Sequence, residues 1–194
     1  MRLDIAAVAE RGSRTVDGEH RSAAVLAPVI ERDGGHHLLF IRRADDLSEH
    51  AGQMSFPGGG HEPGDDDLRG TALREADEEV GLRAEEAEIV GRLDEIHTIT
   101  DYAVRPYVAR VADRQYVPDG EEATAVVVLP VAGLVDPTNY EFERRVHSAG
   151  GEVIVHYFHV NDHTVWGATG DILVDLLEVT TDWRAPEHNE DGRA

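Results

Sequence analysis

The stretch that decides the fold runs from a glycine- and proline-rich loop into a helix. The loop reads Phe56-Pro57-Gly58-Gly59-Gly60-His61-Glu62-Pro63-Gly64-Asp65, and the later part reads Arg74-Glu75-Ala76-Asp77-Glu78-Glu79-Val80-Gly81-Leu82. Residues 65–67 are three aspartates that offer an N-cap and negative charge for a first turn, and Gly81 suits a C-terminal cap. An apolar stripe at four-residue spacing predicts a helix up to Val80: Leu68, Ala72, Ala76 and Val80.

Three glutamates crowd one face of this helix. At about 100° per residue, Glu78 and Glu79 lie roughly 60° and 40° to either side of Glu75. Like charges at this spacing repel one another, and a divalent cation would turn that repulsion into coordination. Oxygen-only ligands favour Mg²⁺ or Mn²⁺, and the glycine loop can bring backbone groups close to the same ion and to a phosphate. Taken alone, the cluster equally fits a solvated acidic face, because one residue in five is acidic.

Other phosphate and metal loops do not match this segment. The loop lacks the Gly-Lys-Ser/Thr ending of a P-loop and the glycine spacing of a dinucleotide fingerprint. Counted from Asp65, the twelfth position is Ala76, where an EF-hand needs a carboxylate. The chemistry therefore depends on the loop and the helix together.

Strands are expected on both sides of the loop and helix. Residues 22–32 and 37–43 read as two strands around an Asp33-Gly34-Gly35 turn, and the glycine-rich loop covers about residues 51–64. Further strands are expected near 88–96, 103–111, 123–129, 140–147 and 152–160, with a last helix near 169–179. This mixture predicts one α/β domain over residues 1–184, followed by a disordered tail over residues 185–194.

Length and composition restrict the class of protein. A chain of 194 residues that is 41% hydrophobic can bury the core of a single domain. The absence of cysteine excludes disulfides, thiolate nucleophiles and zinc sites built on sulfur. With 39 acidic and 18 basic residues, the formal charge of −21 argues against binding to nucleic acid or to anionic membranes.

The acidic, lysine-free composition indicates the salt conditions in which the protein works. All 18 basic residues are arginine, and an acidic surface without lysine favours a cytoplasm of very high salt; a GC-rich genome is the alternative reading. The N-terminus does not resemble a targeting segment. The longest apolar stretch, residues 23–30, is too short to cross a bilayer. We therefore expect a cytoplasmic protein.

The loop and helix together resemble the Nudix box, written as Gly, five residues, Glu, seven residues, then Arg-Glu-apolar-x-Glu-Glu-x-Gly-apolar. Residues 74–82 match its second half at every fixed position except the small Ala76 at an apolar slot. The first half can be aligned in two ways. If Gly59 is the opening glycine, Asp65 replaces the glutamate and one extra residue precedes Arg74. If Gly60 is the opening glycine, Asp66 replaces the glutamate. The resemblance implies the Nudix fold, a mixed β-sheet sandwiched between helices (α/β/α).

The wider context is similar to the coenzyme A pyrophosphatase-like branch of Nudix hydrolases. The matching residues are Leu38-Leu39, Arg43, Leu47, Gly52 to Gly59 and Glu62, then Leu93-Asp94-Glu95, Thr98, Thr100, Tyr102, Val104 to Val108, Trp166 to Thr169 and Ile172-Leu173. The pattern departs at Ser48, where an arginine usually follows the leucine, and at Phe40 and Ala44. Loss of that arginine removes a bidentate phosphate contact, so the reaction type is better supported than coenzyme A as the substrate.

The resemblance implies metal-assisted attack of water on a pyrophosphate, with Mg²⁺ or Mn²⁺ as cofactor. It implies metal ligation by Glu75, Glu78, Glu79 and the carbonyl of Gly58. Arg74 is expected to hold the carboxylates in register, while Glu75, or Glu121 or Glu122 from the turn before strand 123–129, is expected to act on the water. Substrate-binding positions are expected at Arg43, Gly59 and Gly60. His50 and His61 lie near the loop, and Trp166 fits either base stacking or the core.

Three functions remain open from the sequence. The first is hydrolysis of coenzyme A or its derivatives to 3′,5′-ADP and 4′-phosphopantetheine. The second keeps the chemistry on ADP-ribose, nucleotide sugars, dinucleoside polyphosphates or nucleoside triphosphates. The third is a non-catalytic nucleotide-binding Nudix domain, which the glutamate cluster disfavours. The expected partner is a nucleotide diphosphate substrate rather than a nucleic acid or a membrane, and a homodimer is common among Nudix proteins.

Overall fold

The structure is a computed structural model and describes residues 1–18, 20–44, 52–146 and 151–186. Its largest element is a mixed sheet built on two long neighbouring strands, β1 (Arg21–Arg32) and β7 (Tyr102–Val111), which run parallel. The main path of the sheet is β3-β2-β1-β7-β5, with β2 (Gly35–Arg43), β3 (Met54–Ser55) and β5 (Glu88–Arg92). Three further strands pair with this path: β4 (Gly58–Gly60) with β1, β6 (Ile96–His97) with β7, and β8 (Ala123–Pro130) with β2. The expected mixed sheet is confirmed.

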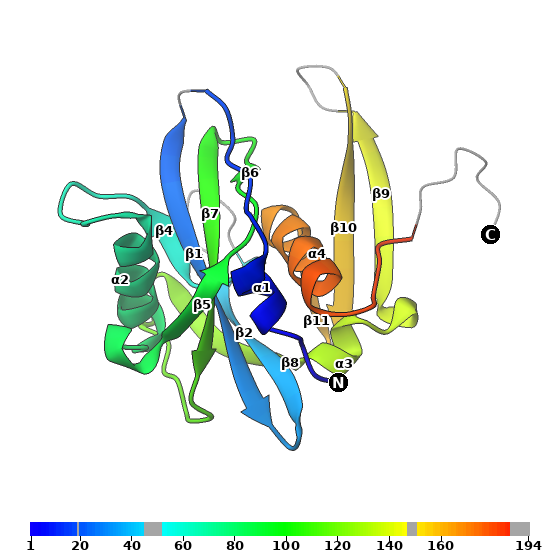
Figure 1. Ribbon diagram of the computed structural model, residues 1–194, viewed down its shortest axis with the longest axis horizontal. Helices are drawn as coiled ribbons and strands as arrows, with labels where there is room; N and C mark the ends of the chain where they lie inside the picture. The colour runs from blue at the N-terminus through cyan, green and yellow to red at the C-terminus, as the bar shows by residue number, and fades with distance from the viewer. Residues whose placement is uncertain (19, 45–51, 147–150, 187–194) are drawn as a thin grey trace.

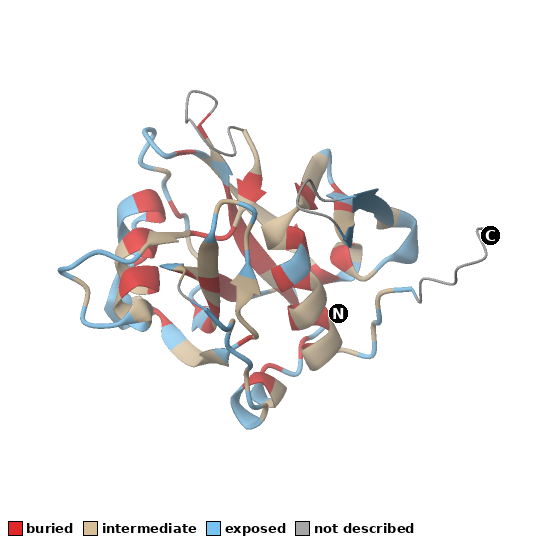
Figure 2. Ribbon diagram, turned by 90° about the horizontal axis from the view of Figure 1, so that it is seen from above, coloured by how far each residue is buried: buried red, intermediate tan, exposed pale blue. Residues whose placement is uncertain are grey.

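Helices cover both faces of this sheet, as expected. Because side chains alternate along a strand, Ala24, Leu26 and Ile30 of β1 pack with α2 (Leu68–Val80) on one face. Ala23, Ala27 and Val29 pack on the other face, in the same cluster as α1 (Ala6–Glu10) and α4 (Ala168–Thr180). Figure 1 shows α2 on one side of the sheet, with α1 and α4 on the other. Buried segments concentrate in the central strands and the inward faces of α2 and α4 (Figure 2).

A second, three-stranded sheet was not expected. It has the order β11-β10-β9, from β9 (Tyr140–Val146), β10 (Glu152–Val160) and β11 (His163–Trp166). Phe158 and Val165 of this sheet are fully buried in the cluster that includes α4. The helix α3 (Val131–Leu134) and the 3₁₀ helices η1 (Ala84–Glu86) and η2 (Pro137–Asn139) complete the described elements. The three-stranded sheet thus packs against α4 as a separate layer.

Several predicted boundaries need correction. The strand expected at 88–96 is divided into β5 and β6, with the break after Arg92, and β5 itself has an irregular register with β7 between Ile89 and Gly91. The loop expected over 51–64 contains the short strands β3 and β4, and α1 and β11 were not anticipated. The strand expected to reach residue 147 ends at Val146; residue 147 and residues 187–194 of the expected tail lie outside the described residues. Within the described residues, no helix has the length and apolar character needed to cross a membrane.

Candidate active site

Helix α2 carries the glutamates, and its ends are set by local sequence. The Asp67 carboxylate caps its N-terminus by accepting the Gly70 N–H at 2.8 Å, and Gly81 ends it in the left-handed region at φ 64°. Ala72 and Ala76 of the predicted stripe are fully buried against the sheet. Glu75 and Glu79, which neighbour this stripe, are therefore drawn inward, whereas Glu78 is exposed.

The backbone of the glycine loop lies so close to β1 and to the carboxylates that a side chain at Gly58 or Gly59 would clash. Strand β4 pairs with β1, and Gly58 has φ 156°. A Cβ atom on Gly58 would lie 2.4 Å from the carbonyl oxygen of Ala24. A Cβ atom on Gly59 would lie 2.2 Å from Oε1 of Glu75. The two glycines are thus required for the approach of the backbone to β1 and to α2.

Glu79 is the most buried carboxylate of the cluster, with 2% of its surface exposed. Its Oε2 accepts the Gly58 N–H at 2.9 Å, while its Oε1 is buried and has no hydrogen-bond partner among the described residues. The nearest cation is Arg43, whose Nη1 lies 4.0 Å from Oε1. Burial raises the pKa of Glu79 to about 8, and burial likewise raises the pKa of Glu75.

Arg74 links the carboxylates to the loop. Its Nε lies 2.8 Å from Oδ1 of Asp65, its Nη1 lies 2.9 Å from Oε2 of Glu78, and its Nη2 lies 3.1 Å from Oε1 of Glu75. Nη2 also donates to the Gly60 carbonyl at 3.2 Å. The Arg74 guanidinium holds the pKa of Asp65 well below its usual range. These contacts are those of a group that fixes its neighbours in position.

The donor set of this cluster fits a divalent cation. A buried carboxylate oxygen without a partner is costly, and a cation would satisfy it. Glu75, Glu78 and Glu79 offer only oxygen, which suits Mg²⁺ or Mn²⁺ better than softer metals. The Gly58 group in direct contact with Glu79 is its N–H, so the expected role of the Gly58 carbonyl stays a prediction.

A cleft of about 1020 Å³ opens beside the cluster. Its lining includes almost all the predicted site residues, namely Arg43, Gly58, Gly59, Gly60, Arg74, Glu75, Glu78 and Glu122. Glu79 is buried behind this lining, at the contact with Gly58 described above. Glu122 lines the cleft and Glu121 does not, which separates two candidates that the sequence left equal.

Part of the cleft lining was not anticipated from the sequence. It comes from the second sheet, with Arg145, Val146 and Val153, and from the start of α4, with Asp171. Trp166 lines the cleft as well and stacks on Tyr157, with ring centroids 5.9 Å apart. Trp166 belongs to a segment that resembles the family, whereas the residues from the second sheet and Asp171 match no short motif, since only packing brings them to the cleft.

Two of the histidines considered from the sequence do not contribute to this description. His61 hydrogen-bonds Thr71, with Nδ1 3.0 Å from Oγ1, and does not line the cleft. His50 and the departure at Ser48 lie outside the described residues.

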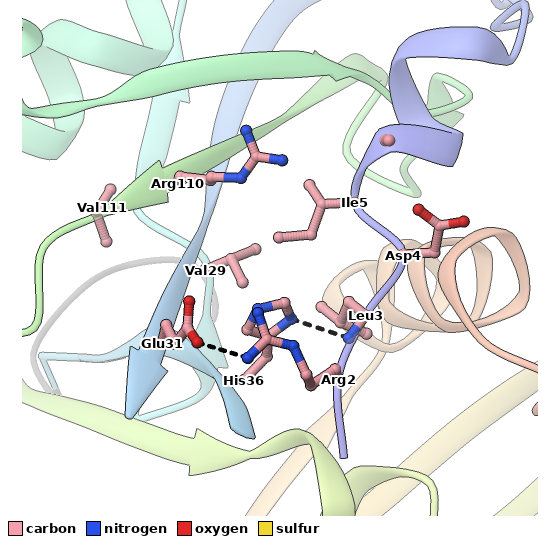
Figure 3. A pocket seen from close by; sticks show the side chains of 10 residues that line it. Arg2, Leu3, Asp4, Ile5, Val29, Glu31, His36, Arg110 and Val111 are labelled. Carbon is pink, nitrogen blue, oxygen red and sulfur yellow. Dashed lines mark hydrogen bonds and ion pairs between the residues drawn. The ribbon is translucent and has the colours of Figure 1, made fainter. Parts of the chain in front are cut away.

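A smaller cavity of about 350 Å³ lies under the N-terminal segment (Figure 3). There Leu3 donates its N–H to Nδ1 of His36 at 2.9 Å, and Arg2 pairs with Glu31. Burial lowers the pKa of His36, which agrees with a neutral ring that accepts this hydrogen bond. These contacts hold residues 1–5 against the sheet. The polar side chains that make them therefore have a structural role and need no ligand.

Comparison with known proteins identifies the family. A family model described as the NUDIX domain matches residues 20–150. An uncharacterized Nudix hydrolase, NudL, of Yersinia pestis (strain Pestoides F) is 35% identical over 160 residues, which are 82% of this chain and 79% of the relative. The same identity and coverage are found for NudL of Yersinia pseudotuberculosis serotype O:1b.

Solved structures show the same fold. A MutT/nudix family protein from Enterococcus faecalis has a TM-score of 0.52 at 14% identity, covering 84% of this chain and 62% of that one. The NUDIX domain of Shewanella oneidensis NrtR, complexed with ADP ribose, has a TM-score of 0.50 at 16% identity, covering 60% and 76%. The fold and the box define a metal-assisted hydrolase. The chain belongs to the Nudix family and is a Nudix hydrolase.

Proposed function

We propose that the protein hydrolyses the diphosphate of coenzyme A or its derivatives, yielding 3′,5′-ADP and 4′-phosphopantetheine, with Mg²⁺ or Mn²⁺ as cofactor. The supporting observation is the mixed lining of the cleft. It combines carboxylates and arginines with apolar side chains that include Ile99, Val146 and Val153. Ile99 and Val146 are more than three-quarters exposed. A substrate with a charged diphosphate and a long, weakly polar arm would match both kinds of lining.

In this proposal Glu75, Glu78 and Glu79 hold the metal. The bound ion would neutralise the diphosphate, polarise phosphorus and lower the pKa of water. The unpartnered Oε1 of Glu79 supports this assignment, because a buried carboxylate oxygen without a hydrogen-bond donor has lone pairs that a cation can use. Arg74 keeps Glu75 and Glu78 in place through the contacts described above.

Glu122 is the proposed general base. It lines the cleft, and its negative charge contributes to the raised pKa of both Glu75 and Glu79, so it acts close to the cluster. The water oxygen attacks one phosphorus, its proton passes to Glu122, and the bond from that phosphorus to the bridging oxygen breaks. Arg43 is proposed to bind the diphosphate; its Nε is buried without a hydrogen-bond partner among the described residues.

A substrate panel tests the proposal. The full-length enzyme is incubated with Mg²⁺ or Mn²⁺ in high KCl with coenzyme A, ADP-ribose, a nucleotide sugar, a dinucleoside polyphosphate and a nucleoside triphosphate. Release of 3′,5′-ADP and 4′-phosphopantetheine with the highest kcat/KM supports coenzyme A. Faster release of AMP from ADP-ribose transfers the assignment to that substrate, and binding without turnover indicates a non-catalytic domain.

Variants on one helix test the metal ligands. Glu78→Gln and Glu79→Gln are expected to lower kcat by at least about a hundredfold, since each removes a ligand charge. Asp77→Asn is the matched control, because Asp77 is an exposed residue of α2 that does not line the cleft. Unchanged turnover in Glu79→Gln, or an equal loss in Asp77→Asn, would reject the metal-cluster mechanism.

A further inference from the structure

A second group of ligand atoms lies at the rim of the cleft, on the side of β1 and β7. It consists of His20, just before β1, His97 at the end of β6, and Asp101 in the turn between β6 and β7. Oδ1 of Asp101 lies 2.8 Å from Nδ1 of His20 and 3.1 Å from Nε2 of His97. One ligand atom from each residue falls within 4.8 Å of the others.

The hydrogen bonds of His20 leave one ring nitrogen facing an acceptor. Its Nε2 lies 3.1 Å from the Asp17 carbonyl oxygen, which can only accept, so Nε2 carries the proton. In the neutral ring, Nδ1 then has a lone pair directed at the Asp101 carboxylate. Two acceptors at 2.8 Å require a positive species between them, which is either a second ring proton or a bound metal ion. Histidines that ligate metals have this arrangement, with the second nitrogen donating to a carbonyl or carboxylate.

The turn that carries these ligands is ordered by its own backbone. Asp101 donates its N–H to the Thr98 carbonyl at 3.0 Å and accepts the Arg21 N–H at 3.1 Å through its carbonyl. Its φ of 63° is left-handed, a conformation that aspartate and asparagine tolerate better than most residues. Tyr102 donates its N–H to Oγ1 of Thr98 at 3.1 Å. The three ligands are therefore positioned before any ion binds, which lowers the entropic cost of binding.

We propose that His20, His97 and Asp101 form a binding site for a transition-metal ion of the Zn²⁺ or Co²⁺ type. Two imidazoles and one carboxylate suit these metals and disfavour Mg²⁺. The site is therefore chemically distinct from the all-oxygen cluster on α2. Two of its members, His97 and Asp101, are largely exposed and leave the remaining coordination positions to water.

The ion would join the start of β1 to the β6–β7 turn. Ile99 and Thr100 of that turn line the cleft, as does His97, whereas His20 and Asp101 do not. A bound ion would thus hold one wall of the cleft in place without contributing to the carboxylate end. The site does not depend on which diphosphate the enzyme cleaves.

The test is metal binding to untagged, chelator-treated, full-length protein in saturating Mg²⁺, which occupies the oxygen site. Calorimetry with Zn²⁺ and the visible absorption of Co²⁺ measure affinity and stoichiometry. We expect one ion per chain, and at least about tenfold weaker binding in His97→Gln and in Asp101→Asn. Asp101→Asn retains a residue that tolerates the left-handed turn, so its metal-free melting temperature is expected to match that of the wild type.

His159→Gln is the matched control. His159 is a half-exposed histidine on β10 that hydrogen-bonds Glu141 and Thr164, away from the proposed ligands. Its Zn²⁺ and Co²⁺ affinities are expected to equal those of the wild type. Absence of stoichiometric binding, equal affinity in Asp101→Asn and wild type, or an equal loss in His159→Gln would overturn the proposal.

Discussion

Gly59 and Glu75 occupy adjoining space at the carboxylate end of the cleft, and this contact makes a direct prediction. In Gly59→Ala, the new Cβ would meet Oε1 and Oε2 of Glu75 at 2.2 and 3.0 Å, so the carboxylate must move. We expect a loss of about 1–3 kcal/mol in the free energy of unfolding and a fall in kcat, because Glu75 leaves its position. Urea denaturation and steady-state kinetics measure the two effects.

Gly60→Ala is the control for the stability effect. A Cβ atom there meets only Cε1 and the hydroxyl oxygen of Tyr102, both at 3.9 Å, which is ordinary van der Waals contact. The free energy of unfolding of this variant is expected to stay within about 0.5 kcal/mol of the wild type. If both alanine variants are equally stable, the close approach of loop and helix in the structure is wrong.

At the scale of residues, most of the side chains and glycines predicted for the site line one cleft, while their roles stay predictions. The spacing of Glu75, Glu78 and Glu79 placed all three on one face of α2, yet only Glu75 and Glu79 are buried. Periodicity gives the direction of a side chain around the helix axis, whereas burial depends on the loop that covers it. For the same reason Glu121 and Glu122 were indistinguishable in sequence, and only the packing of the cleft separates them. Their catalytic roles remain predictions.

At the scale of elements, one ion-pair cluster fastens η1 to the segment that follows β7. Glu86 accepts hydrogen bonds from Arg83 and from Arg114, whose Nε and Nη2 lie 3.1 and 2.8 Å from its two oxygens. Arg114 also donates to the Gly81 carbonyl at 2.8 Å, at the end of α2. The Arg83 and Arg114 guanidinium groups lower the pKa of Glu86 to about 2.

This pKa predicts how stability depends on pH. The folded pKa of about 2 is below the unfolded value of about 4.3, so the ionised carboxylate stabilises the fold above pH 4.3, and this contribution disappears as the pH falls through 2. The stability difference between wild type and Glu86→Gln is therefore expected to be largest at neutral pH and to shrink below about pH 4. Thermal melts from neutral to acidic pH measure it.

Glu85→Gln provides the comparison for this prediction. Glu85 is mostly exposed and lies 3.4 Å from Arg83, without the Arg114 contacts of Glu86. Its substitution is expected to change the melting temperature little at any pH. A stability difference for Glu86→Gln that is constant from pH 7 to pH 3 would show that Glu86 does not titrate as described.

The sequence predicted individual elements better than their arrangement. The Asp33-Gly34 turn was recognised, and both residues have positive φ, at 52° and 74°. Asn161 and Asp162 have the same property, at 50° and 64°, so the hairpin that leads into β11 had a detectable signal. The need for Gly91 within β5 had none, because a Cβ atom there would lie 3.0 Å from the Val8 carbonyl oxygen of the unanticipated helix α1.

At the scale of the whole molecule, the formal charge of −21 opposes folding. Compaction brings like charges closer together, and the 18 arginines cannot neutralise 39 carboxylates. Several arginines are already engaged in ion pairs with more than one acid; Arg11, for example, contacts both Asp94 and Asp175. The remaining acidic side chains repel one another through solvent, where dissolved ions can screen them.

Salt is therefore expected to stabilise the protein. Raising KCl from about 0.1 M to about 1 M shortens the Debye length from about 10 Å to about 3 Å, which removes most of the repulsion between exposed charges. The same screening weakens exposed ion pairs, but these contribute little individually, so the melting temperature should rise with KCl. A triple variant, Glu10→Gln, Asp66→Asn and Asp182→Asn, neutralises three exposed acids that lie on α1, before α2 and after α4. It is expected to be more stable than the wild type at low salt and to gain less from KCl. A melting temperature that falls with KCl, or a salt response unchanged in the triple variant, would show that charge repulsion does not limit the stability of this fold.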